Sequence, residues 1–597
     1  MTHKTFINIC LTLIALCWTM AIQAQTTVDG INYNLKSDKT AEVTNSNVTG
    51  DIVIPEKITV DGVEYSVTSI GISAFFECKA LTSVNMPSVT SIGSSAFSAC
   101  SSLTSVTMPS VTSIGINAFN ECKALTSVAM PSVTSIGDQA FWSCSSLTSV
   151  AMPSVTSIGI SAFSACSSLT SVVMPLVTSI DDDAFLACSS LTSMEMPSVT
   201  SIGINAFYNC KALTSVAMPS VTSIGEGAFN SCSSLESVAM PSVTSIGDGA
   251  FNSCSSLESV AMPSVTSIGD RAFNSCSSLE SVDMPSVTSI GGSAFNSCSN
   301  LESVNLLKVV SIKDYAFYGT LIIKVSLPAT LQSLGSGNFN NAAKVVLAST
   351  TPPVITDGCG KDVFSSFTAF LVPETSLEVY RNADVWKNYA KQMLSLSDRV
   401  DYNVTTTAQD NTSCLRNVIG EDNFAKVVSL KVTGTINSYD IMVIRNKMPL
   451  LQFLDLTDAT IVANDYEYYT GCHTEDNVIG KSMFCELDKL VSVKLPKNVT
   501  CIRYDALLCC TRLVEVVLPV KLESIGAFAF NNCINLTNID LPPTLKTIGG
   551  SAFSYCYNLT NINLPPTLKT IGGSAFLFCI YNHRTTKTNQ KYPSVNL

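Results

Sequence analysis

Hydrophobic positions recur along most of the chain with a period of 22 residues. A Phe occurs at positions 75, 97, 119, 141, 163, 185, 207, 229, 251, 273 and 295, and a Cys follows three residues later each time, from Cys78 to Cys298. Self-similarity at a fixed period of this length is typical of solenoids, in which each unit forms one coil of a stacked array. The pattern therefore predicts a repeat solenoid.

The unit Leu81–Ser102 shows how one coil is expected to fold. Leu81, Val84 and Met86 have the spacing of inward residues on a short strand of a leucine-rich repeat. Pro87 ends that strand because proline has no N–H to give to the ladder. One unit cannot bury this apolar set alone, so neighbouring units must stack.

The second half of the unit predicts another short strand and a corner. Val89 and Ile92 form a second apolar pair, and Gly93 permits the chain to turn. The next inward positions have the spacing of one helical or 3₁₀ turn. They are Ala96, Phe97 and Cys100.

The unit resembles the BspA-type leucine-rich repeats of bacterial surface proteins, whose unit reads approximately LTSVxIPxxVTSIGxxAFxxCxx. About 350 of the 597 residues match that pattern or its flanks. The segments Val372-Pro373, Ser376, Tyr380 and Trp386–Tyr389 are similar to end-caps of Bacteroides-like members. The resemblance implies a secreted or surface-exposed protein that adheres to host matrix proteins, such as fibronectin or fibrinogen, or to other cells.

The repeat pattern and its interruptions predict seven segments. Short alternating runs precede the repeats, the period is lost between the two arrays, and the second array has a 23-residue period. The predicted segments are a signal peptide (1–24), an N-terminal β cap (25–65), a first leucine-rich-repeat array (66–320), degenerate repeats with an end-cap (321–400), an intermediate α/β leucine-rich segment (401–480), a second leucine-rich-repeat array (481–579) and an irregular tail (580–597).

The N-terminus has the pattern of a secretory signal. Lys4 precedes the largely apolar stretch Phe6–Ile22, and Ala24 suits the last residue before cleavage. Lipidation at Cys17 is the alternative, but Leu16 stands where that cleavage needs a small residue. After Gln25 no run of about 18 apolar residues follows, so we expect a secreted or bacterial cell-surface protein without a membrane span.

Composition excludes several classes of function. The chain has 34 Lys and Arg against 46 Asp and Glu, a net charge of -12, which argues against binding nucleic acid through a general basic surface. Only 13% of residues are charged and the mean hydropathy is +0.32, so the chain is not expected to be disordered.

The cysteines from Cys78 to Cys298 are related by translation along the predicted solenoid. Parallel Cβ vectors would strain a disulfide between neighbours, so a ladder of buried thiols is expected, with systematic disulfides as the alternative. The other cysteines lack the paired C-x-x-C spacing of a zinc site. No metal or cofactor is predicted.

Catalytic motifs have little support. The mature chain has only His473 and His583, neither inside a recognisable catalytic motif, and no G-x-S-x-G, P-loop or dinucleotide fingerprint lies in a suitable setting. Paired carboxylates are not excluded by sequence. We therefore expect no enzyme, with a catalytic segment around Asp401–Gly480 as an alternative.

One position of the unit varies systematically along the array. The first outward strand residue is Thr from Thr82 to Thr214 and becomes Glu at Glu236, Glu258, Glu280 and Glu302. In register, these four carboxylates would stack about 4.8 Å apart. Either they bind a basic partner segment or cations, or they result from duplication of one unit. The run Asp181–Asp183 is interpreted as a solvated corner and not as a calcium site.

These features together predict a non-enzymatic secreted or cell-surface binding protein. By the family resemblance it is a bacterial adhesin that engages host matrix proteins or other cells through an extended repeat surface. The alternative is an envelope scaffold or glycan-capture protein without a host protein partner. Partner-binding residues are expected at Glu236, Glu258, Glu280 and Glu302, and no nucleic acid is expected.

Overall fold

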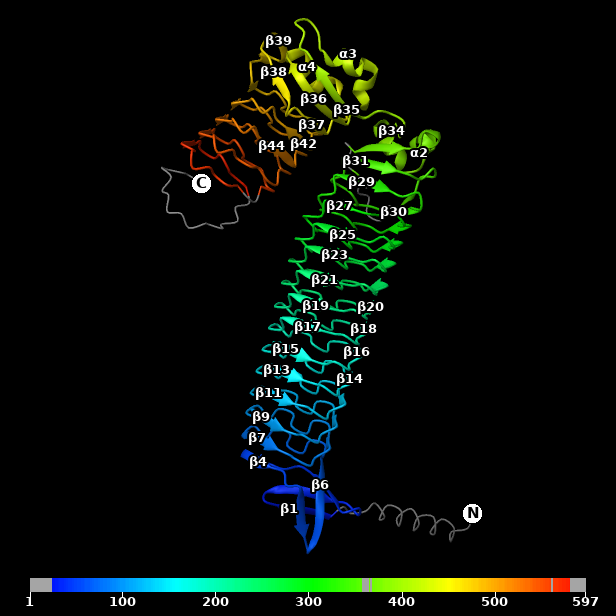
Figure 1. The fold of residues 1–597 in the computed structure, drawn as a ribbon, viewed down its shortest axis with the longest axis vertical. Helices are drawn as coiled ribbons and strands as arrows, with labels where there is room; N and C mark the ends of the chain where they lie inside the picture. Colours follow the sequence, from blue (N-terminus) through cyan, green and yellow to red (C-terminus); the bar gives the residue numbers. More distant parts are fainter. Residues whose placement is uncertain (1–23, 357–363, 365–367, 560–561, 580–597) are drawn as a thin grey trace, which may run out of the picture. The chain divides into compact units, whose positions relative to one another are not determined.

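The computed structural model describes residues 24–356, 364, 368–559 and 562–579. They form two compact units, one of the described residues up to Asn341 together with 353–356 and 364, and one of 342–352 together with the described residues from 368 onward. Most elements are short strands that pair in parallel with the strand one repeat away, so the chain is the repeat solenoid that the sequence predicts (Figure 1). Apart from Ala24, the predicted signal peptide and the predicted irregular tail lie outside the described residues.

Strands β1 to β6 precede the first rung, where a rung means one coil of the solenoid. They are β1 (Ala24–Val28), β2 (Ile31–Leu35), β3 (Thr40–Val43), β4 (Gly50–Val53), β5 (Lys57–Val60) and β6 (Val63–Ile70). β1, β2 and β3 pair antiparallel in sequence, and β5 pairs antiparallel with β6. β4 and β6 pair in parallel with the first repeat strands, β7 and β8. They therefore cover the open hydrogen-bonding edges of the first rung.

Two columns of short parallel strands run along the rest of the first unit (Figure 1). The first column consists of β7 (Leu81–Asn85), β9 (Ser105–Thr107), β11 (Ser127–Ala129), β13 (Ser149–Ala151), β15 (Ser171–Val173), β17 (Ser193–Glu195), β19 (Ser215–Ala217), β21 (Ser237–Ala239), β23 (Ser259–Ala261), β25 (Ser281–Asp283) and β27 (Ser303–Val304), and β29 (Lys324–Leu327) follows it in the chain. The second consists of β8 (Ser91–Ile92), β10 (Ser113–Ile114), β12 (Ser135–Ile136), β14 (Ser157–Ile158), β16 (Ser179–Ile180), β18 (Ser201–Ile202), β20 (Ser223–Ile224), β22 (Ser245–Ile246), β24 (Ser267–Ile268), β26 (Ser289–Ile290), β28 (Ser311–Ile312), β30 (Ser333–Gly335) and β32 (Val354–Thr356).

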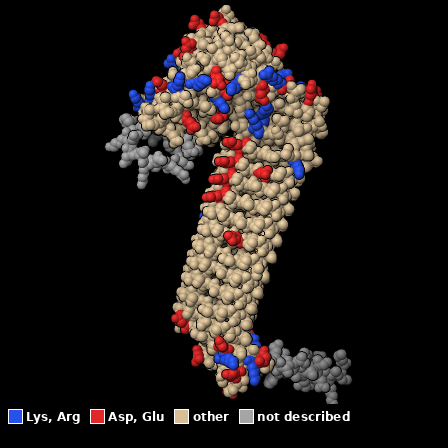
Figure 2. Space-filling view, in the orientation of Figure 1, with Lys and Arg blue, Asp and Glu red and all other residues tan. Residues whose placement is uncertain are grey.

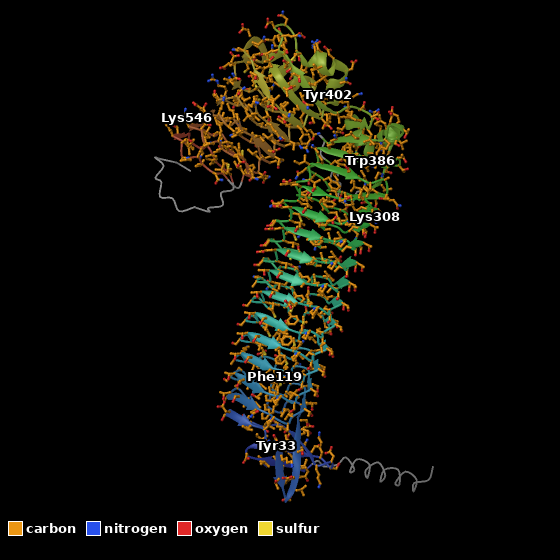
Figure 3. The ribbon with its side chains drawn as sticks, viewed as in Figure 1. Tyr33, Phe119, Lys308, Trp386, Tyr402 and Lys546 are labelled. Carbon is orange, nitrogen blue, oxygen red and sulfur yellow. The ribbon has the colours of Figure 1, made fainter. Side chains whose placement is uncertain are left out.

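The interior is filled by the residues that the repeat pattern assigns to it. In the rung that begins at Leu81, all eight predicted inward residues are buried. The Phe rings of successive rungs stack with their centroids 5.1 to 5.5 Å apart, and Phe119 lies inside the coil in Figure 3. Each stacked pair contributes about 0.5–1.5 kcal/mol beyond the burial of its area, so the column of rings joins rung to rung.

The cysteines from Cys78 to Cys298 are free and buried. Each thiol from Cys100 onward donates a hydrogen bond to the backbone carbonyl of the Phe in the preceding rung, as Cys100 Sγ does to Phe75 O at 3.0 Å. Burial raises the pKa of the Cys100 thiol to about 12. Cysteine therefore serves here as a small, protonated, buried donor.

The corner after the second strand is a run of turns and not the predicted helical turn. Ser95 and Ala99 have φ angles of 56° and 59°, in the left-handed region, which a right-handed helix does not contain. Alternate amides of the corner donate to the next rung, as Phe97 N does to Ala118 O at 2.7 Å. The amides between them close turns within the rung, so stacking satisfies the donors that a helix would satisfy internally.

Gly93 is required by the neighbouring rung and not by its own φ angle. A Cβ atom there would stand 2.8 Å from Gly71 C and 2.9 Å from Ile72 N, closer than real Cβ atoms approach backbone. From the sequence, this glycine is expected to allow the chain to turn at the corner. The structure shows instead that it allows two rungs to approach closely.

One rung departs from the regular stack. It carries Leu176 where the other rungs from Ser88 to Ser286 have Ser, and Asp181 where the other rungs from Gly93 to Gly291 have Gly. The hydrogen-bonded sheets end at β14 and β15 and begin again at β16 and β17, and the stacked rings on both sides of Phe185 are 5.5 Å apart. The Asp181 side chain adds atoms where a Cβ is already crowded, so we attribute the looser contact to these two substitutions.

The second unit begins with a small parallel sheet and a set of short helices. Its elements are β31 (Lys344–Leu347), β33 (Ala369–Val372), β34 (Met393–Ser395), η1 (Glu374–Ser376), α2 (Leu377–Asn382) and η2 (Trp386–Gln392). Trp386, labelled in Figure 3, is buried edge-on against Phe370 and Tyr380, and the Tyr380 hydroxyl donates to Ser349 O at 3.0 Å. The sequence Val385–Tyr389 predicts a short amphipathic helix, and the structure has a 3₁₀ helix there, η2.

An α/β segment follows and leads into the second array. It contains β35 (Asp401–Thr406), α3 (Leu415–Ile419), η3 (Glu421–Lys426), β36 (Ser429–Ile436), α4 (Ser438–Lys447), β37 (Phe453–Asp455), β38 (Ala459–Ile461), β39 (Asn464–Tyr469) and β40 (Cys472–Thr474). The second array contains β41 (Val478–Ile479), β42 (Ser492–Lys494), β43 (Cys501–Ile502), β44 (Glu515–Val517), β45 (Ser524–Ile525), β46 (Thr547–Ile548) and β47 (Thr570–Ile571). Strands β35, β36, β37, β42 and β44 form one parallel sheet, so the array continues the sheet of the α/β segment.

The sequence predicts a helix from Tyr439 to Lys447 with Ser438 as its N-cap. The structure contains this helix as α4, but its N-cap is Asn437. The Asn437 side chain accepts from Tyr439 N at 3.1 Å, and Asn437 N donates to Asp440 Oδ2 at 3.2 Å. This capping box satisfies two backbone donors at once. Ser438 instead bonds to Thr474 on the hairpin β39–β40.

The thiol ladder predicts an unusually steep loss of stability at alkaline pH. A thiol whose folded pKa is raised stabilises the fold fully below its unfolded pKa of about 9, and this contribution is lost as pH rises toward 12. Each such thiol removes about 1.4 kcal/mol per pH unit in that window. Thermal melts between pH 8 and pH 12 should show this slope, and it should be shallower in C144A/C166A/C188A. An equal slope in that variant would contradict the ladder's role.

The loose rung predicts a stabilising double substitution. L176S/D181G restores the repeat consensus and should raise the free energy of unfolding by about 1–2 kcal/mol, through one more backbone hydrogen bond and tighter ring stacking. Denaturant unfolding of the full chain measures this. G137A, which adds a Cβ at a regular rung, is the matched control and should destabilise. An unchanged or lower midpoint for L176S/D181G would show that the substitutions do not cause the gap.

Candidate binding surface

Glu236, Glu258, Glu280 and Glu302 form one exposed column on the first unit, here called the acidic stripe. Each precedes a strand of the first column, and these strands pair in register from β21 to β27. Glu258 N donates to Glu236 O at 3.2 Å, and Glu280 N donates to Glu258 O at 3.0 Å. The structure therefore brings the four predicted residues together in one line.

The acidic stripe stands out from a largely uncharged surface. Figure 2 shows acidic side chains in a line over β21 to β27, whereas the strands before them carry few charges in this view. Two like charges about 4 Å apart in water repel by about 1 kcal/mol, less with salt. The stripe therefore carries unfavourable energy that a cationic partner would relieve.

The threonines in the rungs before the stripe present acceptors at the same position. Thr104 Oγ1 donates to Thr82 O at 2.9 Å, and the same bond recurs in every rung up to Thr214. Since a hydroxyl has one proton, each threonine has only lone pairs and a methyl group left for a ligand. A partner that binds along this row must therefore supply donors.

Acidic residues at the rung corners are used within the solenoid. Asp182 Oδ1 accepts from Ile204 N at 2.7 Å, and Asp138 Oδ1 accepts from Ile160 N at 2.9 Å in an earlier rung. Asp248, Asp270 and Asp314 accept the equivalent amide in the same way. The run Asp181–Asp183 is thus a structural corner. Burial and the charges of Asp182 and Asp138 raise the pKa of Asp181.

The segment that the sequence leaves open for catalysis has a buried polar cluster. Asp440 is fully buried and accepts hydrogen bonds from Ser413 Oγ at 2.6 Å and from Cys414 Sγ at 3.1 Å. Burial, followed by the charge of Asp440, raises the pKa of Cys414 to about 12. The hydrogen bonds of Asp440 hold the start of α3 against α4. Because Cys414 and Asp440 are both buried, neither is placed to contact a substrate.

The other candidates for catalysis or metal binding form no cluster within the described residues. His473 is exposed on β40, and its ring forms no hydrogen bond with any other described residue. Within residues 24–356, 364, 368–559 and 562–579, no group of three His, Cys, Asp or Glu side chains could hold a metal ion. Nor does any helix in that part of the chain have the length and apolarity to span a membrane.

The structure adds one site that sequence reasoning missed. The aromatic-rich run Asp465–Tyr469, which the sequence predicts to be an exposed loop, lies in strand β39, with Tyr466 39% and Tyr469 40% exposed. Tyr466 stacks on Tyr439 of α4, with ring centroids 3.9 Å apart and the planes 17° from parallel. Only tertiary structure pairs these two rings, since they are 27 positions apart in sequence.

Comparison with known families agrees with this geometry. A family model described as "BspA type Leucine rich repeat region (6 copies)" matches residues 56–170, 156–276, 222–346 and 477–592, more than half of the chain. The chain belongs to this family. BspA-type leucine-rich-repeat proteins are typically non-catalytic binding scaffolds, and leucine-rich-repeat proteins generally bind other proteins.

Solved structures of bacterial leucine-rich-repeat proteins resemble this BspA-type chain. A leucine rich cell surface protein from Faecalibacterium prausnitzii is 31% identical over 52% of this chain and 90% of its own, with a TM-score of 0.38. The leucine rich repeat protein of T. pallidum is 31% identical over 32% and 91%, with a TM-score of 0.29. One from Bacteroides ovatus is 21% identical over 93% and 92%, with a TM-score of 0.25. No curated protein matches the chain.

The alignment of the acidic stripe predicts a measurable effect on stability. E258T/E280T removes two stacked charges and supplies two hydroxyls that can donate to the preceding rung, so the melting temperature should rise. The part that comes from repulsion, about 1 kcal/mol or less for each neighbouring pair, should shrink as salt is added. E195T removes a solitary exposed carboxylate and is the matched control. Salt-independent melting differences would show that the four carboxylates do not interact.

Proposed function

We propose that this protein is a bacterial surface-binding protein that engages a basic segment of a protein partner through the strand face at β21–β27. Membership of the family supports the non-enzymatic binding role. The observation that carries the proposal is the exposed, in-register acidic stripe, which continues a row of threonines whose hydroxyl protons are already used. Lysine and arginine side chains supply both the charge and the donors that this row lacks.

The regular spacing of the stripe favours multivalent binding. Strands one repeat apart lie about 4.8 Å apart, and an extended peptide rises about 3.3 Å per residue. Basic side chains on an extended partner therefore have several carboxylates within reach at once. Each exposed ion pair contributes about 1 kcal/mol or less, so useful affinity requires several together.

Adhesion is the biological role that we infer from this binding mode. The family resemblance implies matrix proteins such as fibronectin or fibrinogen as partners, and secretion is inferred from the N-terminal pattern of Lys4, Phe6–Ile22 and Ala24. An envelope scaffold or glycan-capture protein is the alternative role.

Binding assays on residues 25–597 test the proposal. The protein should bind immobilised fibronectin or fibrinogen saturably, and binding should weaken as salt rises. E236T/E258T/E280T/E302T should weaken binding at least about tenfold and flatten the salt dependence, because three to four weak ion pairs are lost together. The control variant neutralises four exposed carboxylates elsewhere: E56Q, E195T, E378Q and D540N.

Three outcomes would contradict the proposal. Equal loss of binding in the control variant would show that net charge and not the stripe determines binding. Unchanged binding in the stripe variant would remove the stripe as the site. Binding to a glycan panel but to neither matrix protein would favour the glycan-capture alternative.

A further inference from the structure

The second unit contains a pocket that is separate from the strand face of the first unit. It has a volume of about 660 Å³. Its lining residues are Asp410, Tyr439, Ala463, Asn464, Asp465 and Tyr466. Two aromatic rings and two carboxylates thus line one small pocket, and no Lys or Arg does.

The two tyrosines offer an aromatic surface of fixed geometry. Tyr439 lies in the first turn of α4, Tyr466 lies on β39, and their rings are stacked at 3.9 Å. Tyr466 is 39% exposed, so the pair is accessible to a ligand. An aromatic face carries negative electrostatic potential and attracts ammonium and guanidinium groups.

The two carboxylates in the pocket have the same preference. Asp410 and Asp465 are exposed, and within the described part of the chain their side chains form no hydrogen bond or ion pair. The next acidic residues, Glu467 and Asp476, each accept a backbone N–H and hold the hairpin in shape. The local charge of the pocket is therefore negative, and it has two carboxylates left to accept from a ligand.

The walls of the pocket are tied together before any ligand arrives. Asn437, the cap of α4, donates from Nδ2 to Gln409 O at 2.8 Å, which holds the turn that carries Asp410. Thr474 N donates to Ser438 Oγ at 2.9 Å, which holds the hairpin against α4. Tyr466 N donates to Asn464 Oδ1 at 3.0 Å within β39. A preorganised site loses little conformational entropy on binding.

We propose that this pocket binds an organic cation, an alkylammonium or guanidinium group, which the Tyr439–Tyr466 pair and the carboxylates of Asp410 and Asp465 hold. Both parts of the pocket favour positive charge, whereas a neutral sugar would use the rings and gain little from the charge of the carboxylates. The group can belong to a free amine or to the side chain of a polypeptide. This inference does not depend on the acidic stripe, which lies in the other unit.

Saturation-transfer NMR on the full chain tests the pocket, with choline, arginine ethyl ester, a lysine-containing pentapeptide and maltose as probes. The cations should bind, more weakly at high salt, and maltose should not. D465N and D410N should each weaken binding about three- to tenfold, Y466A should abolish it, and Y466F should keep it because the ring face remains. D540N and Y557A, far from the pocket in sequence, are matched controls.

The choice of probe and variant separates the possible results. Binding of the pentapeptide in preference to choline and arginine ethyl ester identifies a polypeptide source, and the reverse identifies a free amine. Maltose binding that Y466A abolishes, or cation binding that D465N and Y466A leave unchanged, would overturn the proposal, as would the absence of any cation binding. Since D465N changes only an exposed side chain, it tests the pocket even where Y466A fails to fold. E236T/E258T/E280T/E302T should bind choline normally, which distinguishes failure here from failure of the proposed function.

Discussion

The rung-to-rung backbone hydrogen bond is the interaction on which the rest of this structure depends. It joins each strand and each alternate corner amide to the neighbouring rung, one 22-residue repeat away, as Phe97 N to Ala118 O shows. Because the rungs are related by translation, a residue type that recurs at one position of the repeat forms a column along the solenoid. Phe gives a stack of rings, Cys gives a ladder of protonated thiols, and Thr gives a row of hydroxyls whose protons are already used. The energy of each contact is small, but the same contact recurs in every rung, so the sum along the array is large.

The same constraint explains how the surface acquires chemistry. Within a column of identical rungs, one substitution repeated four times produces a line of carboxylates at Glu236 to Glu302, which no single loop could arrange so regularly. The second unit uses a different device, because a capped helix and a hairpin bring Tyr439 and Tyr466 together from distant positions. Regular and irregular parts of the chain thus offer two acidic surfaces, one extended and one concave.

The fold and the acidic stripe could be predicted because both follow from periodicity. The positions of Phe97 and Cys100 in the repeat decide which side chains are buried, and the register aligns Glu236 with Glu258. The corner is not predicted, since Ser95 and Ala99 adopt left-handed φ angles. Among the rungs that share this corner from residue 95 to residue 293, only Gly227 and Gly249 place a glycine at the Ser95 position to indicate it. The sequence predicts the N-cap of α4 one residue too late because Asn437 and Ser438 are both good caps, and only their contacts decide between them. The tyrosine pocket depends on a tertiary pairing that local pattern does not contain.

Mapping the cysteines tests the in-register stack most directly. The full chain would be alkylated without reductant, once folded and once denatured, and each site would be identified by peptide mass spectrometry. We predict that the eleven thiols from Cys78 to Cys298 are unmodified in the folded protein and all modified after denaturation. Labelling of these thiols in the folded protein, or disulfide-linked pairs among them after denaturation, would contradict the stacked rungs on which the account rests.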